Sequence, residues 1–210
     1  MTRIKICGIT RVEDLRTAVE YGADALGLVF YEASPRNVTI PHAAHLAQAT
    51  PPFVNLVGLF VNPGVAEVHA VLRHVPLATL QFHGEETPEF CAQFNMPYLK
   101  AIRVKAGVDL LQCASVFSSA QGLLLDAHVE GIQGGTGATF DWTLIPKQMP
   151  MPIILSGGLD AKNVAEAIKL VKPYAVDVSS GVEAIKGIKD VAKIAAFINE
   201  VKHCDLQLSR

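Results

Sequence analysis

Eight short apolar segments recur along the whole chain, and stretches with the spacing of amphipathic helices separate them. The apolar segments are residues 4–7, 25–30, 55–61, 78–82, 98–104, 122–126, 152–155 and 175–178. The helical stretches include residues 12–21, 43–49, 65–75, 88–94, 161–171 and 190–201. Nearly continuous apolar strands that alternate with helices are typical of a parallel sheet covered by helices. The pattern therefore predicts an α/β protein.

Eight strand and helix units favour closure of the sheet into a (β/α)8 TIM barrel of the phosphate-binding type. The alternative is an open doubly wound sheet, which binds its ligand at a single switch point. Residues able to do chemistry instead follow many of the predicted strands, which favours the barrel. No linker, low-complexity segment or charge block divides the chain. We predict one barrel domain over residues 1–210.

The composition of the chain argues against nucleic acid and membranes as binding partners. Half of the residues are hydrophobic and the formal net charge is only −2, so nothing suggests binding to nucleic acid. The N-terminus lacks the features of a secretion signal, and no apolar run approaches the roughly 18 residues of a membrane span. The four cysteines are too widely spaced for a disulfide framework. We expect a cytoplasmic protein that has no membrane partner.

Polar and glycine residues follow most of the predicted strands. They are Cys7 and Gly8, Ser34 to Arg36, Asn62, His83 and Gly84, Asp126, Ser156 to Gly158, and Ser179 to Gly181. The carboxyl ends of all strands share one rim in a parallel barrel, so residues far apart in sequence can converge there. The distribution predicts a single site on that rim.

The loops after the seventh and eighth predicted strands contain candidate anion ligands. Gly157 and Gly158 follow the seventh strand, and Ser180 and Gly181 follow the eighth, where a short extra helix is also expected. Glycines let backbone N–H groups approach an anion, and these two loops are the usual phosphate site of such barrels. The alternative is that the glycines only form tight turns. Their occurrence on adjacent strands favours phosphate binding.

A third glycine cluster follows the sixth predicted strand. It includes Gly134, Gly135 and Gly137 and is long enough to fold over a bound ligand. We interpret it as a lid over the substrate.

Two residues at strand ends are candidates for proton transfer. Cys7 lies two residues after Lys5 on the same strand face, and that lysine could favour the thiolate, although buried cysteines are more often inert. Asp126 ends an apolar strand, and apolar surroundings would favour its protonated form, which can act as an acid. A capping role is the alternative for Asp126. Asp177 competes for the acid role or contacts substrate.

Two further side chains are candidate substrate ligands. Arg36 could bind a carboxylate through its two-pronged guanidinium, or it could be an ordinary exposed arginine. His83 either faces the ligand or bonds a loop carbonyl, and we favour the carbonyl. The other histidines show no metal-ligand spacing, so no metal is expected.

Five segments together closely resemble the phosphoribosylanthranilate isomerase family, in order and over essentially the whole chain. They are residues 5–10 (KICGIT), 81–84 (QFHG), 134–137 (GGTG) with 140–142 (FDW), 155–159 (LSGGL) and 176–183 (VDVSSGVE). The resemblance implies a cofactor-free Amadori rearrangement in tryptophan biosynthesis. Its substrate is N-(5-phosphoribosyl)anthranilate and its product is 1-(2-carboxyphenylamino)-1-deoxyribulose 5-phosphate. A monomer or a homodimer is expected. Phe82 replaces the aliphatic residue expected before the histidine.

The resemblance also implies roles for individual residues. Asp126 matches the general acid that protonates the ribose ring oxygen, and Cys7 matches the general base that removes the C2 proton. Arg36 matches the residue near the anthranilate carboxylate. The remaining matched positions are substrate contacts (His83, Asp177, Gly134, Gly135) and phosphate loops (Gly157, Gly158, Ser180, Gly181).

Three rival interpretations predict features that differ. An indole-glycerol-phosphate synthase should have a lysine-rich catalytic set and a longer N-terminal extension, and a ribulose-phosphate epimerase should have metal-binding histidines at strand ends. Neither feature is present. A catalytically silent metabolite-binding protein would not need both Cys7 and Asp126.

Overall fold

Eight parallel strands close into one barrel in the computed structural model, which describes residues 1–127 and 140–209. The strands are β1 (Arg3–Cys7), β2 (Ala25–Phe30), β3 (Asn55–Phe60), β4 (Thr79–Phe82), β5 (Tyr98–Val104), β6 (Gly122–Ala127), β7 (Ile153–Leu155) and β8 (Ala175–Val178). β8 pairs with β1 and thereby closes the barrel. The predicted (β/α)8 barrel is confirmed, and every predicted strand end lies within one residue of the observed end.

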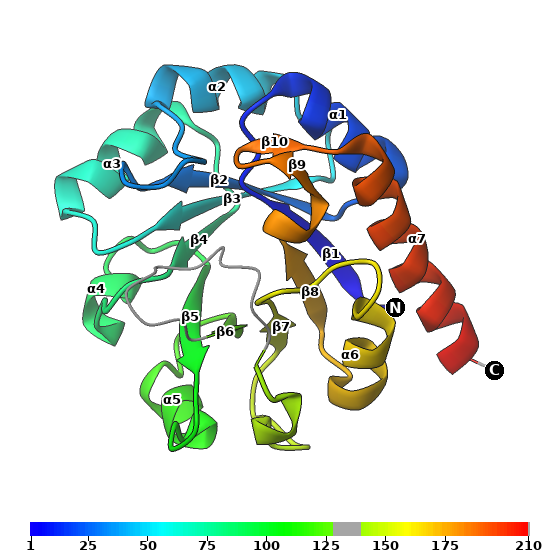
Figure 1. The fold of residues 1–210 in the computed structure, drawn as a ribbon. Coiled ribbons are helices and arrows are strands. Elements are labelled where there is room, and N and C mark those ends of the chain that lie inside the picture. Colours follow the sequence, from blue (N-terminus) through cyan, green and yellow to red (C-terminus); the bar gives the residue numbers. More distant parts are fainter. Residues whose placement is uncertain (128–139, 210) are drawn as a thin grey trace.

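Helices surround the barrel on its outer side (Figure 1). They are α1 (Val12–Tyr21), α2 (Ile40–Gln48), α3 (Val65–His74), α4 (Pro88–Ala92), α5 (Leu110–Val116), α6 (Val164–Val171) and α7 (Val191–Leu208). The six stretches predicted above did not include α5. A signal for it is present, because the Asp109 side chain accepts the backbone N–H groups of Leu111 and Gln112 and so caps this helix.

Four residues with capping side chains stand near helix starts, namely Thr10, Asn62, Thr87 and Asp160, and of these Thr87 alone caps the first turn of its helix. Thr87 caps α4, where its hydroxyl accepts a backbone N–H of the first turn. Thr10 instead donates its hydroxyl to the carbonyl of Gly187. Asn62 adopts a left-handed φ of 48° and accepts a backbone N–H from the loop after β4, and Asp160 forms a turn that precedes α6 by several residues. Tertiary contacts and turn geometry thus decided three of these positions.

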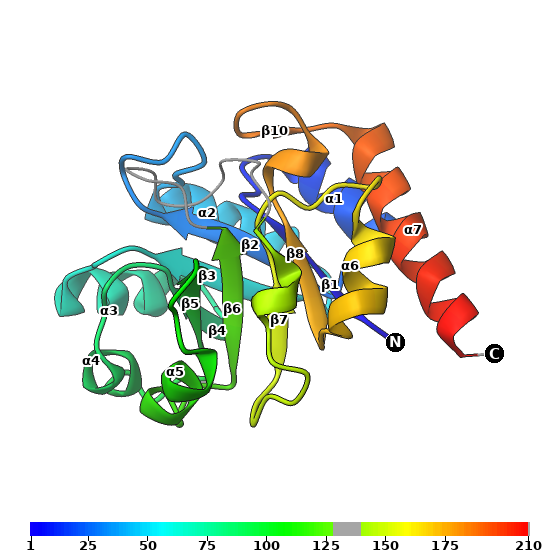
Figure 2. The ribbon, with the colours of Figure 1, turned by 60° about the horizontal axis from the view of Figure 1, so that its bottom comes forward.

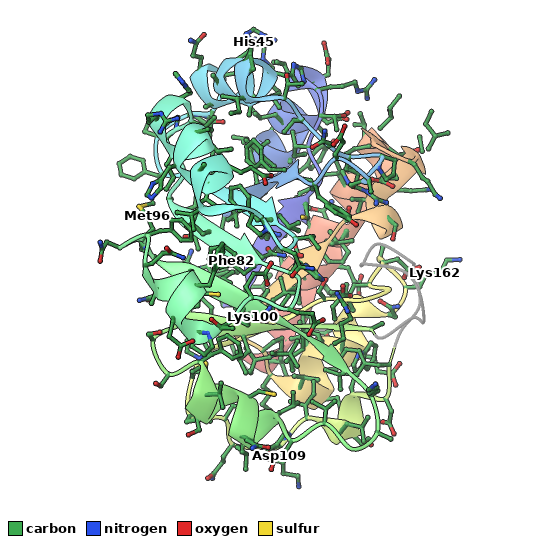
Figure 3. All side chains as sticks on the ribbon, turned by 90° about the vertical axis from the view of Figure 1, so that its left-hand side faces the viewer. His45, Phe82, Met96, Lys100, Asp109 and Lys162 are labelled. Carbon is green, nitrogen blue, oxygen red and sulfur yellow. The ribbon has the colours of Figure 1, made fainter. Side chains whose placement is uncertain are left out.

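Side-chain alternation along β4 determines what reaches the barrel interior. Phe82 is fully buried and packs its ring against Phe60, Phe90, Phe94 and Tyr98 outside the sheet. Figure 3 labels Phe82 beside Lys100, its neighbour on β5. Successive strand residues point to opposite faces, so the residues on either side of Phe82 point into the barrel. The aromatic residue at this position therefore changes the outer packing and not the site.

The chain after β8 adds structure at the carboxyl rim of the barrel. A short 3-10 helix, η2 (Ser180–Val182), leads into a hairpin of β9 (Glu183–Ile185) and β10 (Ile188–Lys189). The predicted extra helix is confirmed as this 3-10 turn, whereas the hairpin was not predicted. Figures 1 and 2 show the hairpin beside the start of α1. There the Lys189 backbone N–H donates to the Asp14 carboxylate at 3.0 Å.

The two chain ends lie together at the opposite, amino end of the strands (Figure 2). The Thr2 hydroxyl donates to Asp205 of α7 at 2.8 Å, and this bond joins the first residues to the last helix. No helix in residues 1–127 and 140–209 is both long and apolar enough to cross a membrane.

Candidate active site

Cys7 ends β1 with its side chain inside the barrel, next to a glycine that makes room for it. The residue is 5% exposed and packs with Val29, Leu59 and Val61. Gly27 stands opposite Cys7 on β2, and a Cβ atom there would lie 2.7 Å from the Cys7 Sγ. Any larger residue at this position would therefore push the thiol out of place.

The charges beneath Cys7 come as a buried pair. The Lys5 Nζ lies 2.8 Å from the Asp177 Oδ1, and each side chain is 5% exposed. Burial raises the pKa of the Cys7 thiol, the Lys5 charge lowers it, and Asp177 raises it again. The net pKa lies above the ordinary value of 9.0. The predicted thiolate-favouring effect of Lys5 thus has the right sign but is smaller than the effect of burial, so the thiol form dominates near neutral pH.

Asp177, the competitor for the acid role, has its carboxylate committed to other partners. It forms the ion pair with Lys5, and the Ser156 hydroxyl is 3.5 Å from its second oxygen. This arrangement disfavours Asp177 as a proton donor.

Arg36 is held by Glu183 through two parallel hydrogen bonds. The Nε and Nη2 atoms lie 2.7 and 2.8 Å from the two carboxylate oxygens, and the Lys189 Nζ lies 2.9 Å from one of them. Arg36 is only 8% exposed, so its interpretation as a surface arginine is wrong. Burial raises the pKa of Glu183, but the bonds and charges of Arg36 and Lys189 outweigh it and hold that pKa below the ordinary value.

Gly8 provides the space for the arginine stem. Its φ of +74° is in the left-handed region, and a Cβ atom there would lie 2.5 Å from the Arg36 Cδ. The Glu183 contacts use the Nε and Nη2 edge of the guanidinium. Its other edge, formed by Nη1 and Nη2, has no hydrogen-bond partner among the side chains of residues 1–127 and 140–209, and it can accept a second carboxylate.

Asp126 ends β6 and lies in a chain of hydrogen-bonding groups. Its Oδ2 is 3.0 Å from the His83 Nε2, and its Oδ1 accepts the Ala127 backbone N–H at 2.9 Å. The His83 Nδ1 is in turn 3.0 Å from the side-chain nitrogen of Gln81. The favoured prediction that His83 bonds a loop carbonyl is wrong, because its ring points into the barrel. The surroundings of Asp126 are buried, as predicted, but they are not purely apolar.

The two predicted anion loops lie against each other. Gly157 and Gly158 have positive φ values of 83° and 62°, which few other residues adopt. A Cβ atom on Gly181 would collide with the carbonyl of Leu159 in the loop after β7. Ser180 begins η2 beside this contact. The structure thus brings together the four residues that were predicted to bind phosphate.

The glycines of the predicted lid cannot be placed, and the described residues offer no candidate metal site. Gly134, Gly135 and Gly137 lie outside the residues that the structure describes. Within the described parts of the chain, no group of three or more His, Cys, Asp or Glu side chains could hold a metal ion.

Sequence reasoning missed several partners of the site residues. Glu183 and Lys189 fix Arg36, and Gln81 contacts His83. The one available signal was strand alternation, which places Gln81 on the same face as His83. The contact between Arg36 and Glu183 spans 147 positions of the chain, and nothing local encodes it.

The closed barrel and the polar residues at its carboxyl rim place the protein in the class of (β/α)8-barrel enzymes. Residues 4–200 match the family model described as N-(5'phosphoribosyl)anthranilate (PRA) isomerase. A curated relative from Thiobacillus denitrificans, named N-(5'-phosphoribosyl)anthranilate isomerase, is 61% identical over 95% of this chain and 98% of its own. The chain belongs to this isomerase family, and the resemblance found in its sequence is confirmed.

Solved structures agree with this assignment. Phosphoribosyl anthranilate isomerase from Thermotoga maritima is 40% identical, with a TM-score of 0.89 over 97% of this chain and 100% of its own. A second structure of such an isomerase contains reduced 1-(o-carboxyphenylamino)-1-deoxyribulose 5-phosphate, with 40% identity, a TM-score of 0.86 and the same coverage. A third, of monomers generated from the dimeric Thermotoga maritima enzyme, is 37% identical, with a TM-score of 0.83 and again the same coverage.

Proposed function

We propose that this chain converts N-(5-phosphoribosyl)anthranilate to 1-(2-carboxyphenylamino)-1-deoxyribulose 5-phosphate, the Amadori rearrangement of tryptophan biosynthesis, without a cofactor. The observation that carries the proposal is the match to the isomerase family over residues 4–200. The positions of Cys7 and Asp126, both inside the barrel at its carboxyl rim, support it. The proposed setting is the cytoplasm, and the proposed unit is one barrel domain over residues 1–210.

Asp126 acts as the general acid and Cys7 as the general base. Asp126 protonates the ring oxygen while the anthranilate nitrogen forms an iminium with C1, which opens the furanose. The Cys7 thiolate then removes the C2 proton, and the enolamine that results tautomerises to the ketone. The reaction needs one protonated and one deprotonated group. Because burial keeps most of the Cys7 thiol neutral, Cys7 acts through the minor fraction that is ionised.

The other rim residues bind and orient the substrate. The Nη1 and Nη2 edge of Arg36 takes the anthranilate carboxylate, since Glu183 occupies only the opposite edge. The loops after β7 and β8 receive the phosphate through Gly157, Gly158, Ser180 and Gly181. His83, Asp177, Gly134 and Gly135 are proposed as further contacts to the substrate.

The partner is a phosphorylated small molecule, and neither nucleic acid nor a membrane is involved. The chain works as a monomer or a homodimer. The solved relative from Thermotoga maritima that is described as dimeric supports the homodimer.

The test follows the fluorescence of N-(5-phosphoribosyl)anthranilate with purified protein, without added metal or nucleotide. The expected result is accelerated loss of fluorescence with formation of the ketose product, identified by mass spectrometry. A rate equal to that of a buffer control would overturn the proposed function.

A further inference from the structure

The proposed general acid must hold a proton, but the hydrogen bonds around Asp126 leave it none to give. The amide nitrogen of Gln81 can only donate, so the His83 Nδ1 that faces it must accept. The proton of a neutral imidazole then sits on Nε2, which donates to Asp126 at 3.0 Å. The Ala127 N–H occupies the other oxygen. Asp126 in this arrangement is a carboxylate with two donors.

The orientation of the Gln81 amide is the one element of this chain that can reverse. The amide oxygen and nitrogen have nearly the same shape, and their orientation is assigned from hydrogen bonding. Gln81 is fully buried, and its Oε1 has no hydrogen-bond partner among residues 1–127 and 140–209. Rotation of the amide moves the unpartnered position from the oxygen to the nitrogen, so hydrogen-bond number alone does not favour either state.

We propose that Gln81 is a positioning residue whose amide orientation follows the proton carried by the His83 and Asp126 pair. With Oε1 toward His83, the amide accepts the Nδ1–H, and the pair then holds one shared proton between Nε2 and the Asp126 Oδ2. With the amide nitrogen toward His83, as the structure shows, the pair has given that proton away, and the remaining imidazole proton has moved from Nδ1 to Nε2 by exchange with water. The inference rests on the proposed function, because it concerns the acid of that reaction.

The pair also has charged neighbours on β5 and in the loop after β4. In its acid form the pair is neutral overall, whether the proton sits on His83 or on Asp126. Arg103 stands opposite Asp126 on β5, and its Nη2 donates to the backbone carbonyl of His83 at 3.2 Å. Glu85, which is 80% exposed, is the partner of Arg103.

The other charged groups at this rim come from β1, β8 and the segments that follow β2 and β8. Lys5 and Asp177 form a compensated pair. Arg36, Glu183 and Lys189 form a cluster with one net positive charge. Cys7 is held largely as the neutral thiol because burial raises its pKa. The loop after β7 brings the backbone of Gly157 beside Asp126.

The proton balance of the step closes. The pair gives one proton to the ring oxygen as the bond between C1 and that oxygen breaks, and the nitrogen lone pair forms the C=N bond of the iminium. The Cys7 thiolate takes the C2 proton to form the enolamine, whose hydroxyl proton moves to C1 as the ketone forms. Transfer of a proton from the Cys7 thiol through water to the pair restores both groups.

The experiment uses two substitutions that should shift the pH dependence in opposite directions. Gln81→Met keeps the size but accepts no hydrogen bond, so the alkaline limb of kcat should move to lower pH and kcat should fall about tenfold, within the range that acid catalysis spans. Gln81→Glu can accept from Nδ1 and carries a negative charge, so the alkaline limb should move to higher pH. Thr79→Val, on the same inner face of β4, is the matched control and should leave the limb in place.

A spectroscopic readout on the unaltered protein separates this inference from the proposed function. The ¹⁵N resonances of the His83 ring, assigned by their loss in His83→Asn, report which nitrogen carries a proton. The expected result is a protonated Nδ1 at pH values where the acid is loaded. An unprotonated Nδ1 throughout the active pH range, or an alkaline limb unmoved by both Gln81 variants, would overturn the inference. Absence of turnover would defeat the proposed function, and the resonances would still decide the Nδ1 bond.

Discussion

The two halves of the rim hold their reactive groups by different means. On the side of β1 and β8, buried ion pairs surround Cys7, with Lys5 on Asp177 and Glu183 between Arg36 and Lys189. On the side of β4 and β6, Asp126 lies in a row of hydrogen bonds that starts at a neutral amide. Ion pairs fix geometry and charge, whereas a row of hydrogen bonds can exchange protons. The half around Cys7, the base half, is therefore built to fix positions, and the half around Asp126, the acid half, is built to transfer protons.

The largest effect should come from removing the reacting group on either side. Cys7→Ala and Asp126→Asn should each lower kcat by about 10²–10⁴-fold, because each removes one proton transfer. Inhibition by the product measures affinity, which should stay within a few-fold because neither group is needed to bind the phosphate. A variant with nearly normal turnover would exclude the residue from proton transfer, and that half of the rim would then lack its proposed reacting group.

Glu183→Gln should have the next largest effect, and it tests the base half. The substitution leaves the buried charges of Arg36 and Lys189 without their carboxylate, which should lower the free energy of unfolding by about 3 kcal/mol. Because Arg36 loses its anchor, KM should rise more than kcat falls. Denaturant unfolding and steady-state kinetics measure the two effects.

The ion pair between Arg103 and Glu85 provides the control for that prediction. Glu85 is 80% exposed, so Glu85→Gln should change the free energy of unfolding by no more than about 1 kcal/mol. Equal effects of the two substitutions would mean that burial of the Glu183 pair contributes nothing. In that case the distinction between the two halves of the rim would be lost.

The barrel and the residues at its rim were predictable from local sequence, but the contacts between the side chains of the rim were not. Apolar runs fix the strands, and the parallel topology then brings Cys7 and Asp126 to the same end of the barrel. The pairing of Arg36 with Glu183 depends on where the hairpin after β8 folds back, which no local pattern encodes. Strand alternation could have shown that His83 points inward, since Phe82 between it and Gln81 is an obvious core residue.

The net charge state of Cys7 could not be predicted from the sequence, for a related reason. Adjacency on one strand face correctly places Lys5 near the thiol. The same adjacency says nothing of Asp177, which pairs with Lys5 from across the closure of the barrel. It also gives no measure of burial, which has the largest effect on the pKa of Cys7. Burial and the Asp177 charge, which both depend on the whole fold, therefore raise the pKa of Cys7 more than Lys5 lowers it.

Lys5→Met tests this account of the base half and should have the smallest effect on the chemistry of the site. Because it leaves the buried Asp177 carboxylate without its cation, it should also lower the free energy of unfolding by about 3 kcal/mol. Lys5 lowers the pKa of Cys7, so its removal should raise that pKa further and reduce the thiolate present at any pH below it. Iodoacetamide alkylation of Cys7, followed by peptide mass spectrometry from pH 7 to 10, measures the thiolate. The reaction should accelerate with pH in both proteins and be about tenfold slower in the variant, which corresponds to one pKa unit.

Cys91 supplies the internal reference for the alkylation experiment. Burial raises its pKa to about 12, so it should stay unreacted over the same pH range in both proteins. If Cys91 reacts in the variant, Lys5→Met has loosened the fold. The double variant Lys5→Met with Asp177→Asn, which also removes the unpaired carboxylate, is then used in its place. An unchanged rate at Cys7 beside an inert Cys91 would show that Lys5 serves only Asp177. The ion pair would then stabilise the barrel without tuning the base.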